Sequence, residues 1–337
     1  MLAAVLQAAA LAGVIAFPAQ AHIVPVADML RGISMTPAQC GATPQTVWIN
    51  VHGREFCIRY YLSTAGGGGS RPVVFLQGDR LGKLNLRTGE FALTTRDKDL
   101  DTENFVRTAD SMSKQYKTAA IYLARAGVDG SSGDHRIRHT VLELNVTNTA
   151  LDAIKQRYRF DGFHLIGQSG GSKLVGGMLA LRTDIGCAVL GAGSLHRAGP
   201  KRPASDMSND YFNVSDAVAT IAQKRATRIM LVTDPEDRKV PEPTQTGFVH
   251  SLRNAGGQVE QFMVQATDEH RHAVSGYARA AAAGCLRNDN TETIAEHMQR
   301  LVERRLAAKA IAERSVQPRT EAEAKPTATI VRPGAAN

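Results

Sequence analysis

A serine set between glycines stands near the middle of the chain. Residues 167–171 read Gly-Gln-Ser-Gly-Gly, with Ser169 at their centre. A short apolar run, 163–166, precedes them, and a segment rich in Leu, Val, Met and Ala follows. Strand, tight turn and helix in this order are typical of a nucleophile elbow, in which glycines avoid Cβ clashes and the serine hydroxyl projects from the sheet. We predict that Ser169 is a nucleophile and that the N–H of Gly170 binds an oxyanion.

Two phosphate-binding motifs do not fit this stretch. A P-loop would need glycine in place of Ser172 and a hydroxyl in place of Leu174. A dinucleotide-binding fingerprint would need a third glycine where His196 follows Gly191-Ala-Gly193. The remaining alternative to a nucleophile is a turn that only joins a strand to a helix.

A serine hydroxyl becomes a good nucleophile when a histidine takes its proton and a carboxylate holds that histidine. Such residues follow two apolar runs downstream of the serine. The candidates are Asp234 and Asp237 after the run 228–233, and His270 and His272 after the run 258–264. Because catalytic groups in open α/β sheets gather outside the carboxyl ends of the strands, these positions are where a triad would be expected.

Apolar runs alternate with helical patterns along most of the chain. The expected strands are 46–51, 55–62, 72–77, 119–124, 163–166, 187–192, 228–233 and 258–264. The expected helices are 101–117, 140–158, the segment after Ser169, 215–225, 243–255, 273–284 and 292–314. This repetition predicts an α/β fold with a mostly parallel sheet, helices on both faces and an amino-terminal hairpin. Residues 22–45 are expected to be irregular, and 194–214 to form a cap or pocket wall.

The order of nucleophile, acid and histidine resembles that of the α/β-hydrolase fold, over about residues 45–285. Within that superfamily the chain is similar to esterases and prolyl-oligopeptidase-like hydrolases, which implies an acyl-enzyme mechanism. The resemblance favours Asp237 as the acid, because the family's acid is followed by x-x-Val-Pro, here Arg-Lys-Val-Pro. It favours His272 as the base, because a small and then an apolar residue follow it, Ala273 and Val274.

The run 72–77 ends in Gln77-Gly78-Asp79, where the second oxyanion donor of this fold lies. Gln-Gly stands where many members of the family have His-Gly, and the resemblance implies the N–H of Asp79 as the donor beside Gly170. We expect four residues to contact the substrate: Gln77, Gly78, His135 and Gln168. The loop 126–135, rich in glycine and polar residues, is expected to line the pocket, and the alternative for His135 is a surface position.

The first residues have the character of a leader. Residues 1–17 are almost entirely apolar, and Pro18 and Ala19-Gln-Ala21 follow them before His22. An Ala-x-Ala sequence after an apolar run too short to span a bilayer comfortably predicts a secretory signal peptide, 1–21, although a positively charged start is missing. The alternative is a buried amino-terminal helix. We expect a periplasmic or secreted protein with no stable membrane span after cleavage.

Export predicts that the four cysteines are paired. Three pairings are possible. Cys40 and Cys57 lie close together around the first strand, whereas Cys187 and Cys285 belong to the later half of the chain. We therefore predict the bridges Cys40–Cys57 and Cys187–Cys285, the alternative being four buried thiols.

The composition is that of a globular protein. The 337 residues are 43% hydrophobic and 21% charged, with a net charge of +8. The basic residues are scattered except near the carboxyl end, and aromatic residues, 5%, are too few to interleave with them, so we expect no nucleic-acid partner. We expect a hydrolase domain at 22–316 and a disordered tail rich in Ala, Pro and Thr at 317–337.

Other functions remain open on the sequence alone. Asp268, His270 and His272 are spaced as metal ligands could be, but a further ligand at a defined spacing is missing, so we predict no metal and no cofactor. A non-catalytic binding protein could use the same scaffold. The expected substrate is a small ester or a peptide-like molecule, with a serine peptidase of prolyl-oligopeptidase-like type as the alternative to an esterase.

Overall fold

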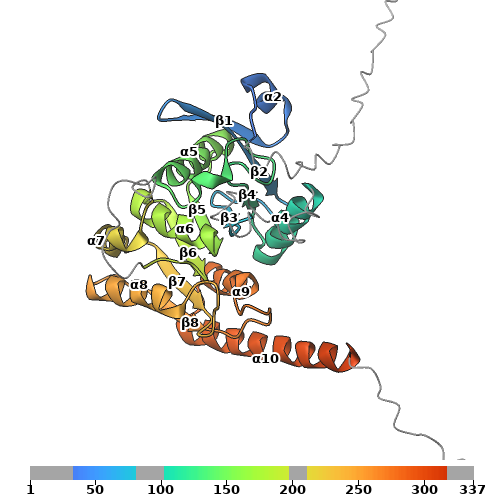
Figure 1. The fold of residues 1–337 in the computed structure, drawn as a ribbon, viewed down its shortest axis with the longest axis vertical. Coiled ribbons are helices and arrows are strands. Elements are labelled where there is room, and N and C mark those ends of the chain that lie inside the picture. The colour runs from blue at the N-terminus through green and yellow to red at the C-terminus, as the bar shows by residue number, and fades with distance from the viewer. Residues whose placement is uncertain (1–32, 81–101, 197–210, 317–337) are drawn as a thin grey trace, which may run out of the picture.

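The computed structural model describes residues 33–80, 102–196 and 211–316. They contain an eight-stranded sheet in the order β1-β2-β4-β3-β5-β6-β7-β8 (Figure 1). The strands are β1 (Thr46–Val51), β2 (Arg54–Ser63), β3 (Val73–Leu76), β4 (Ala120–Leu123), β5 (Phe163–Gln168), β6 (Ile185–Gly191), β7 (Arg228–Thr233) and β8 (Glu260–Met263). Strand β2 is antiparallel to both β1 and β4, and every other pair of neighbouring strands in this sheet is parallel. The predicted fold class is confirmed.

Helices cover both faces of the sheet. They are α4 (Thr102–Tyr116), α5 (Val141–Tyr158), α6 (Gly170–Leu181), α7 (Val218–Ala222), α8 (Glu242–Asn254), α9 (Ser275–Leu286) and α10 (Thr291–Val316). Neighbouring side chains of one strand point to opposite faces. Accordingly, Val74 packs with α5 to α8 in one apolar cluster, whereas Val73 packs with α4, α9 and α10 in the other. The sheet is thus buried on both sides, which leaves its carboxyl edge for the site.

The amino-terminal hairpin turns at His52 and Gly53, which have φ values of 51° and 77°. Two consecutive positive φ values match the twist of a two-residue hairpin turn, and the side chain of Asn50 accepts the N–H of Gly53 at 3.0 Å. The expectation of an irregular 22–45 is wrong within the described part, because helix α2 (Pro37–Ala42) forms there. Thr36 and Gln39 form a capping box at its amino end. This helix-start signal stands among several prolines, which favoured an irregular segment.

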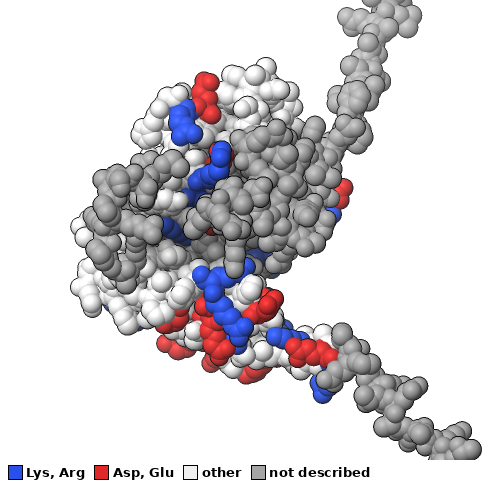
Figure 2. Space-filling view, in the orientation of Figure 1, with Lys and Arg blue, Asp and Glu red and all other residues white. Residues whose placement is uncertain are grey.

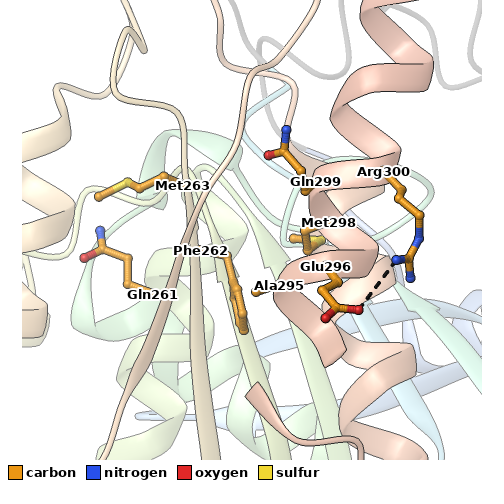
Figure 3. A pocket seen from close by; sticks show the side chains of 8 residues that line it. All are labelled: Gln261, Phe262, Met263, Ala295, Glu296, Met298, Gln299 and Arg300. Atoms are coloured by element: carbon orange, nitrogen blue, oxygen red, sulfur yellow. Dashed lines mark ion pairs between the residues drawn. The ribbon is translucent and has the colours of Figure 1, made fainter. Parts of the chain in front are cut away.

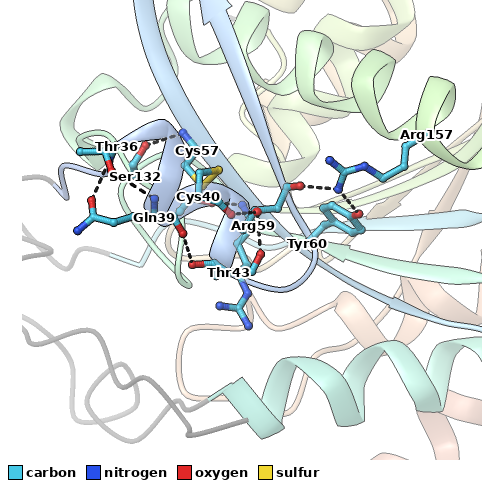
Figure 4. Close-up of a disulfide and its surroundings, with 11 residues drawn as sticks. Thr36, Gln39, Cys40, Thr43, Cys57, Arg59, Tyr60, Ser132 and Arg157 are labelled. Carbon is cyan, nitrogen blue, oxygen red and sulfur yellow. Dashed lines mark hydrogen bonds between the residues drawn. A yellow bond between two sulfur atoms is a disulfide. The ribbon is translucent and has the colours of Figure 1, made fainter. Parts of the chain in front are cut away.

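Two disulfides tie the elements together, at the predicted pairs. Cys40–Cys57 joins α2 to β2 (Figure 4), and Cys187–Cys285 joins β6 to α9. Both bridges have ordinary Cα–Cα separations, 5.7 Å and 6.3 Å. The second bridge closes a long loop and fixes α9 against the sheet.

Some boundaries differ from the expected ones. The expected helix 215–225 is a 3₁₀ turn, Val214–Ala217, followed by the short α7. Helix α9 begins at Ser275 rather than at residue 273, because the N–H of Val274 donates to the carbonyl of His272 inside the preceding loop. The leader 1–21, the tail 317–337 and most of 194–214 lie outside the described residues. Within the described residues, no helix combines the length and apolarity that a membrane span requires.

Basic and acidic side chains lie close together in the region of β8, α9 and α10 on the face seen in Figure 2. The ion pairs there include Arg287 with Asp289 and Arg300 with Glu296. The basic residues near the carboxyl end are therefore partly compensated by neighbouring carboxylates.

Candidate active site

Ser169 sits at a strained turn between β5 and α6. Its φ and ψ are 55° and −120°, a conformation that costs a residue other than glycine about 1–3 kcal/mol. The Ser169 N–H donates to the carbonyl of Gly191 on β6 at 2.8 Å, which holds the turn. A Cβ on Gly167 or Gly171 would collide with backbone atoms, of α6 and of β3 respectively. The two glycines therefore let the elbow approach its neighbours, as the motif predicts.

His272 and Asp237 meet at the carboxyl edge of the sheet. The Nδ1 atom of His272 lies 2.8 Å from Oδ2 and 3.0 Å from Oδ1 of Asp237. The Asp237 carboxylate is completely buried, and its Oδ1 also accepts the N–H groups of Lys239 and Val240. With Nδ1 engaged, Nε2 is the nitrogen left to exchange a proton with a hydroxyl. This is the arrangement in which a carboxylate fixes a histidine tautomer.

The competing residues have other partners. Asp234 is buried and accepts two bonds from the guanidinium of Arg271. His270 is exposed, and its backbone N–H donates to the carboxylate of Asp268. Asp268 also accepts the N–H groups of His272 and Ala273, so its carboxylate caps the loop. Among the described residues, no group of three His, Cys, Asp or Glu side chains is arranged to hold a metal.

Gln168, which we expected to contact a substrate, contacts the loop that carries His272. Its side chain is buried, and Nε2 donates to the backbone carbonyl of His272 at 2.8 Å. The residue before the nucleophile thus links the elbow to the loop that follows β8. Sequence reasoning missed this role, because the bond joins residues 104 positions apart.

The loop after β3 packs directly on the elbow. A Cβ added to Gly78 would lie 3.0 Å from the Cβ of Ser169, so Gly78 touches the nucleophile. The side chain of Asp79 fills the space beside Gly170 where a Cβ would be, together with the guanidinium of Arg125. Gln77 contributes its carbonyl, which lies 3.4 Å from Nη1 of Arg125. The predicted oxyanion residues are therefore neighbours in space.

An ion network built on the buried Arg125 holds the Asp79 carboxylate. Arg125 pairs with Asp79 at 2.8 Å and with Glu143 at 2.7 Å, and the side chains of Arg125 and Glu143 are 2% and 1% exposed. Nε2 of His139 lies 2.8 Å from the same Asp79 carboxylate. Burial opposes ionisation of Asp79, but Arg125 and His139 outweigh it and hold its pKa well below the usual range. Sequence reasoning missed Arg125, although an arginine directly after the apolar run 119–124 was a usable signal.

His135 lies inside the protein and not at the surface. Its side chain is fully buried, with Nδ1 3.2 Å from the carbonyl of Ala126 and Nε2 accepting the N–H of Arg80. Burial first, and then the charge of Arg125, keep its pKa well below the usual value, so the ring is neutral. This placement does not support the expected contact with a substrate. The loop 126–135 packs against β2, where Ser132 accepts the N–H of Cys57 at 2.7 Å, and Asp129 in the loop pairs with Arg80 at 3.2 Å.

A cavity of about 550 Å³ lies away from these residues, between β8 and α10 (Figure 3). Its lining residues are Gln261, Phe262, Met263, Ala295, Glu296, Met298, Gln299 and Arg300. None of these is a predicted site residue. The sequence also predicts that three segments, 79–98, 126–138 and 194–214, shape the acyl pocket. Most of the first and the third lie outside the described residues.

Comparisons with known proteins agree with this geometry at the level of the fold. The sequence matched no protein-family model and no curated protein. Among solved structures, the esterase Pf2001 of Pyrococcus furiosus matches in two crystal forms, with TM-scores of 0.51 and 0.52 and 14% identity. Each match covers 76% of this chain, and 96% and 94% of the esterase. The chain therefore has the predicted α/β-hydrolase fold.

Proposed function

We propose that this protein is a serine hydrolase that cleaves an ester through an acyl-enzyme, with Ser169 as nucleophile, His272 as base and Asp237 as acid. The observation that carries the proposal is the contact of His272 with Asp237, 2.8 Å, at the sheet edge where the strained Ser169 lies. The esterase activity of the Pyrococcus protein is consistent with it.

In the proposed reaction, Oγ of Ser169 attacks the ester carbonyl carbon while Nε2 of His272 takes the hydroxyl proton. The N–H groups of Gly170 and Asp79 bind the oxyanion that forms. Collapse of this intermediate breaks the ester bond, and the leaving alcohol takes the proton from His272. Water then attacks the acyl-enzyme with His272 again as base, which releases the acid and restores Ser169.

We also propose that the chain is exported, to the periplasm or outside the cell. The support is the leader-like stretch 1–21 together with two disulfides, which persist in oxidising compartments. Fractionation of expressing cells, with amino-terminal sequencing of the recovered protein, tests this proposal. A mature chain starting at His22 outside the cytoplasm is expected, and an uncleaved cytoplasmic chain would contradict it.

The catalytic proposal is tested with a fluorophosphonate probe and a substrate panel. Wild-type protein should be labelled and Ser169→Ala should not, while circular dichroism shows the same fold for both. The panel contains p-nitrophenyl esters of increasing acyl length beside aminoacyl and peptidyl amides, and we expect turnover of esters. Faster turnover of the amides would identify a peptidase instead. Absence of labelling and of turnover in the wild type would indicate a binding protein.

A further inference from the structure

We infer that Arg271 and Asp234 form a positioning pair that holds His272 against Asp237, an inference that rests on the proposed role of His272 as the base. Nε and Nη2 of Arg271 donate to Oδ2 and Oδ1 of Asp234 at 2.7 Å and 3.0 Å. The pair joins the two loops that carry the proposed acid and base, since Asp234 directly follows β7 and Arg271 directly precedes His272.

The backbone of Arg271 shows what the pair has to hold. Its φ is 54°, in the left-handed region that residues other than glycine, asparagine and aspartate rarely adopt. Because the residue before the proposed base is an arginine and not a glycine, this backbone conformation is strained. The bidentate contact anchors the side chain of the strained residue, and a bidentate arginine–carboxylate pair defines direction as well as distance. The pair therefore opposes relaxation of the backbone that sets the direction of His272.

Asp234 is suited to be the fixed end of this contact. Its side chain has no exposed surface, and its two oxygens also accept the N–H groups of Ala266 and Glu236. A buried carboxylate with four donors is held rigidly to both loops. Arg271 is 17% exposed and reaches it from outside, with Nη1 3.1 Å from Glu236.

The remaining contacts fix His272 at its two backbone ends. Asp268 accepts its N–H at 3.0 Å, and Gln168 donates to its carbonyl at 2.8 Å. A further bond runs from the N–H of Arg238 to the carbonyl of His270 at 2.9 Å, and it also links the two loops. Within this set, the side-chain contact that joins the two loops is the ion pair of Arg271, which precedes the proposed base, with Asp234, which follows β7.

The test compares Arg271→Gly with Arg271→Lys and with a matched control. Glycine accepts the positive φ and removes the pair, so it separates loss of the contact from added backbone strain. Lysine keeps the charge but cannot make the bidentate contact. The control is Arg228→Gln, which breaks another bidentate pair, Arg228 with Glu260 at 2.6 Å and 2.9 Å. This pair lies at the amino ends of β7 and β8, the strands whose carboxyl ends lead into the two loops.

We expect Arg271→Gly to lower kcat for p-nitrophenyl acetate by about 10- to 100-fold, with KM changed by less than about threefold, because misplacing a reacting group by about 1 Å has an effect of this size. Arg271→Lys should recover only part of the loss, and Arg228→Gln should keep kcat within about twofold. Full recovery with lysine would show that charge alone suffices, and an equal loss in Arg228→Gln would show a general loss of stability. Either result would overturn the inference.

A second readout does not depend on turnover. The proton between Nδ1 of His272 and Asp237 should give a low-field proton NMR resonance, assigned by its absence in His272→Ala. It should shift or broaden in Arg271→Gly and stay unchanged in Arg228→Gln. If the wild type hydrolyses no ester, the proposed function fails and this resonance still tests the positioning. An unchanged resonance in Arg271→Gly would overturn the inference.

Discussion

The Nδ1 atom of His272 lies 2.8 Å from Oδ2 of Asp237, across loops that follow two adjacent parallel strands. The two residues are 35 positions apart, and the parallel register of β7 and β8 brings their loops to the same edge. Backbone N–H groups of Lys239 and Val240 donate to the other oxygen of this carboxylate, Oδ1, which lies 3.0 Å from the same nitrogen. The ring is thereby directed by a carboxylate that cannot easily turn away.

Replacing the acid should separate Asp237 from Asp234. Asp237→Asn is expected to lower kcat about 10⁴-fold, because an amide can favour the wrong histidine tautomer. Asp234→Asn should lower kcat less, since it weakens the contact with Arg271 but leaves the contact of Asp237 with the His272 ring in place. Steady-state kinetics on one ester measures both. A larger loss in Asp234→Asn would reverse the assignment.

Replacing the histidines should separate base from bystander. His272→Ala should abolish turnover and fluorophosphonate labelling with Ser169 still present, because no group remains to take the hydroxyl proton. His270→Ala is the matched control, an exposed neighbour in the same loop, and should label at a near wild-type rate. Gel fluorescence after timed labelling compares the two. Lost labelling in His270→Ala alone would move the base to that residue.

A single methyl group at Gly170 should disturb the oxyanion site. Gly170→Ala would place its Cβ against the Asp79 carboxylate and the Arg125 guanidinium, which must then shift. We expect a loss of roughly 10²- to 10³-fold in kcat, the size found when one oxyanion donor is removed. Gly68→Ala is the control, because no heavy atom lies within 4 Å of its added Cβ. Unchanged kcat in Gly170→Ala would show that Asp79 does not set the site.

The exported protein should contain no free thiol. Each bridge is expected to stabilise the fold by about 2–4 kcal/mol, mainly by restricting the unfolded chain, with the larger effect from the Cys187–Cys285 loop. Peptide mapping without reduction should recover the pairs Cys40–Cys57 and Cys187–Cys285. Urea denaturation of Cys187→Ser/Cys285→Ser measures the contribution of the longer loop. A peptide joining Cys40 to Cys187 would contradict the pairing.

Stability should fall in mild acid, partly through His164. Burial and then the charge of Arg71 lower the pKa of His164 to about 4, and its Nδ1 accepts the N–H of Cys187 at 3.1 Å. Because the folded pKa lies below the unfolded value of about 6.5, the unfolded chain takes up this proton first. The free energy of unfolding should therefore decrease from about pH 6.5 to about pH 4, with a slope of up to about 1.4 kcal/mol per pH unit from this group.

His164→Gln should reduce that slope by the share of one proton, as measured by urea denaturation across this pH range. The control is His250→Gln, at an exposed position within α8, which should keep the wild-type slope. His135 is also buried with a lowered pKa and acts in the same sense, so the difference between variant and wild type is the relevant quantity. Identical slopes for wild type and His164→Gln would contradict the prediction.

Local patterns in the sequence were enough to predict the fold class and to name the candidates for the triad, and the resemblance to α/β-hydrolases chose Asp237 and His272 among them. Alternating apolar and helical segments depend on neighbours within a few residues, and so does the glycine spacing around Ser169. The succession of strands and helices along the chain, the hairpin and the elbow therefore follow from short stretches of sequence. The disulfide pairs were also predicted, because Cys40 and Cys57 lie close together in the sequence and Cys187 and Cys285 both belong to its later half.

Contacts between distant segments were decided only by the tertiary structure. Asp79 comes to lie beside Gly170 because β3 pairs with β5, and Arg125 reaches both because β4 pairs with β3. The buried place of His135 and the bond from Gln168 to His272 have the same origin. No spacing along the chain encodes such contacts, since their partners are selected by the order of strands in the sheet and by how the loops fill the space at its edge.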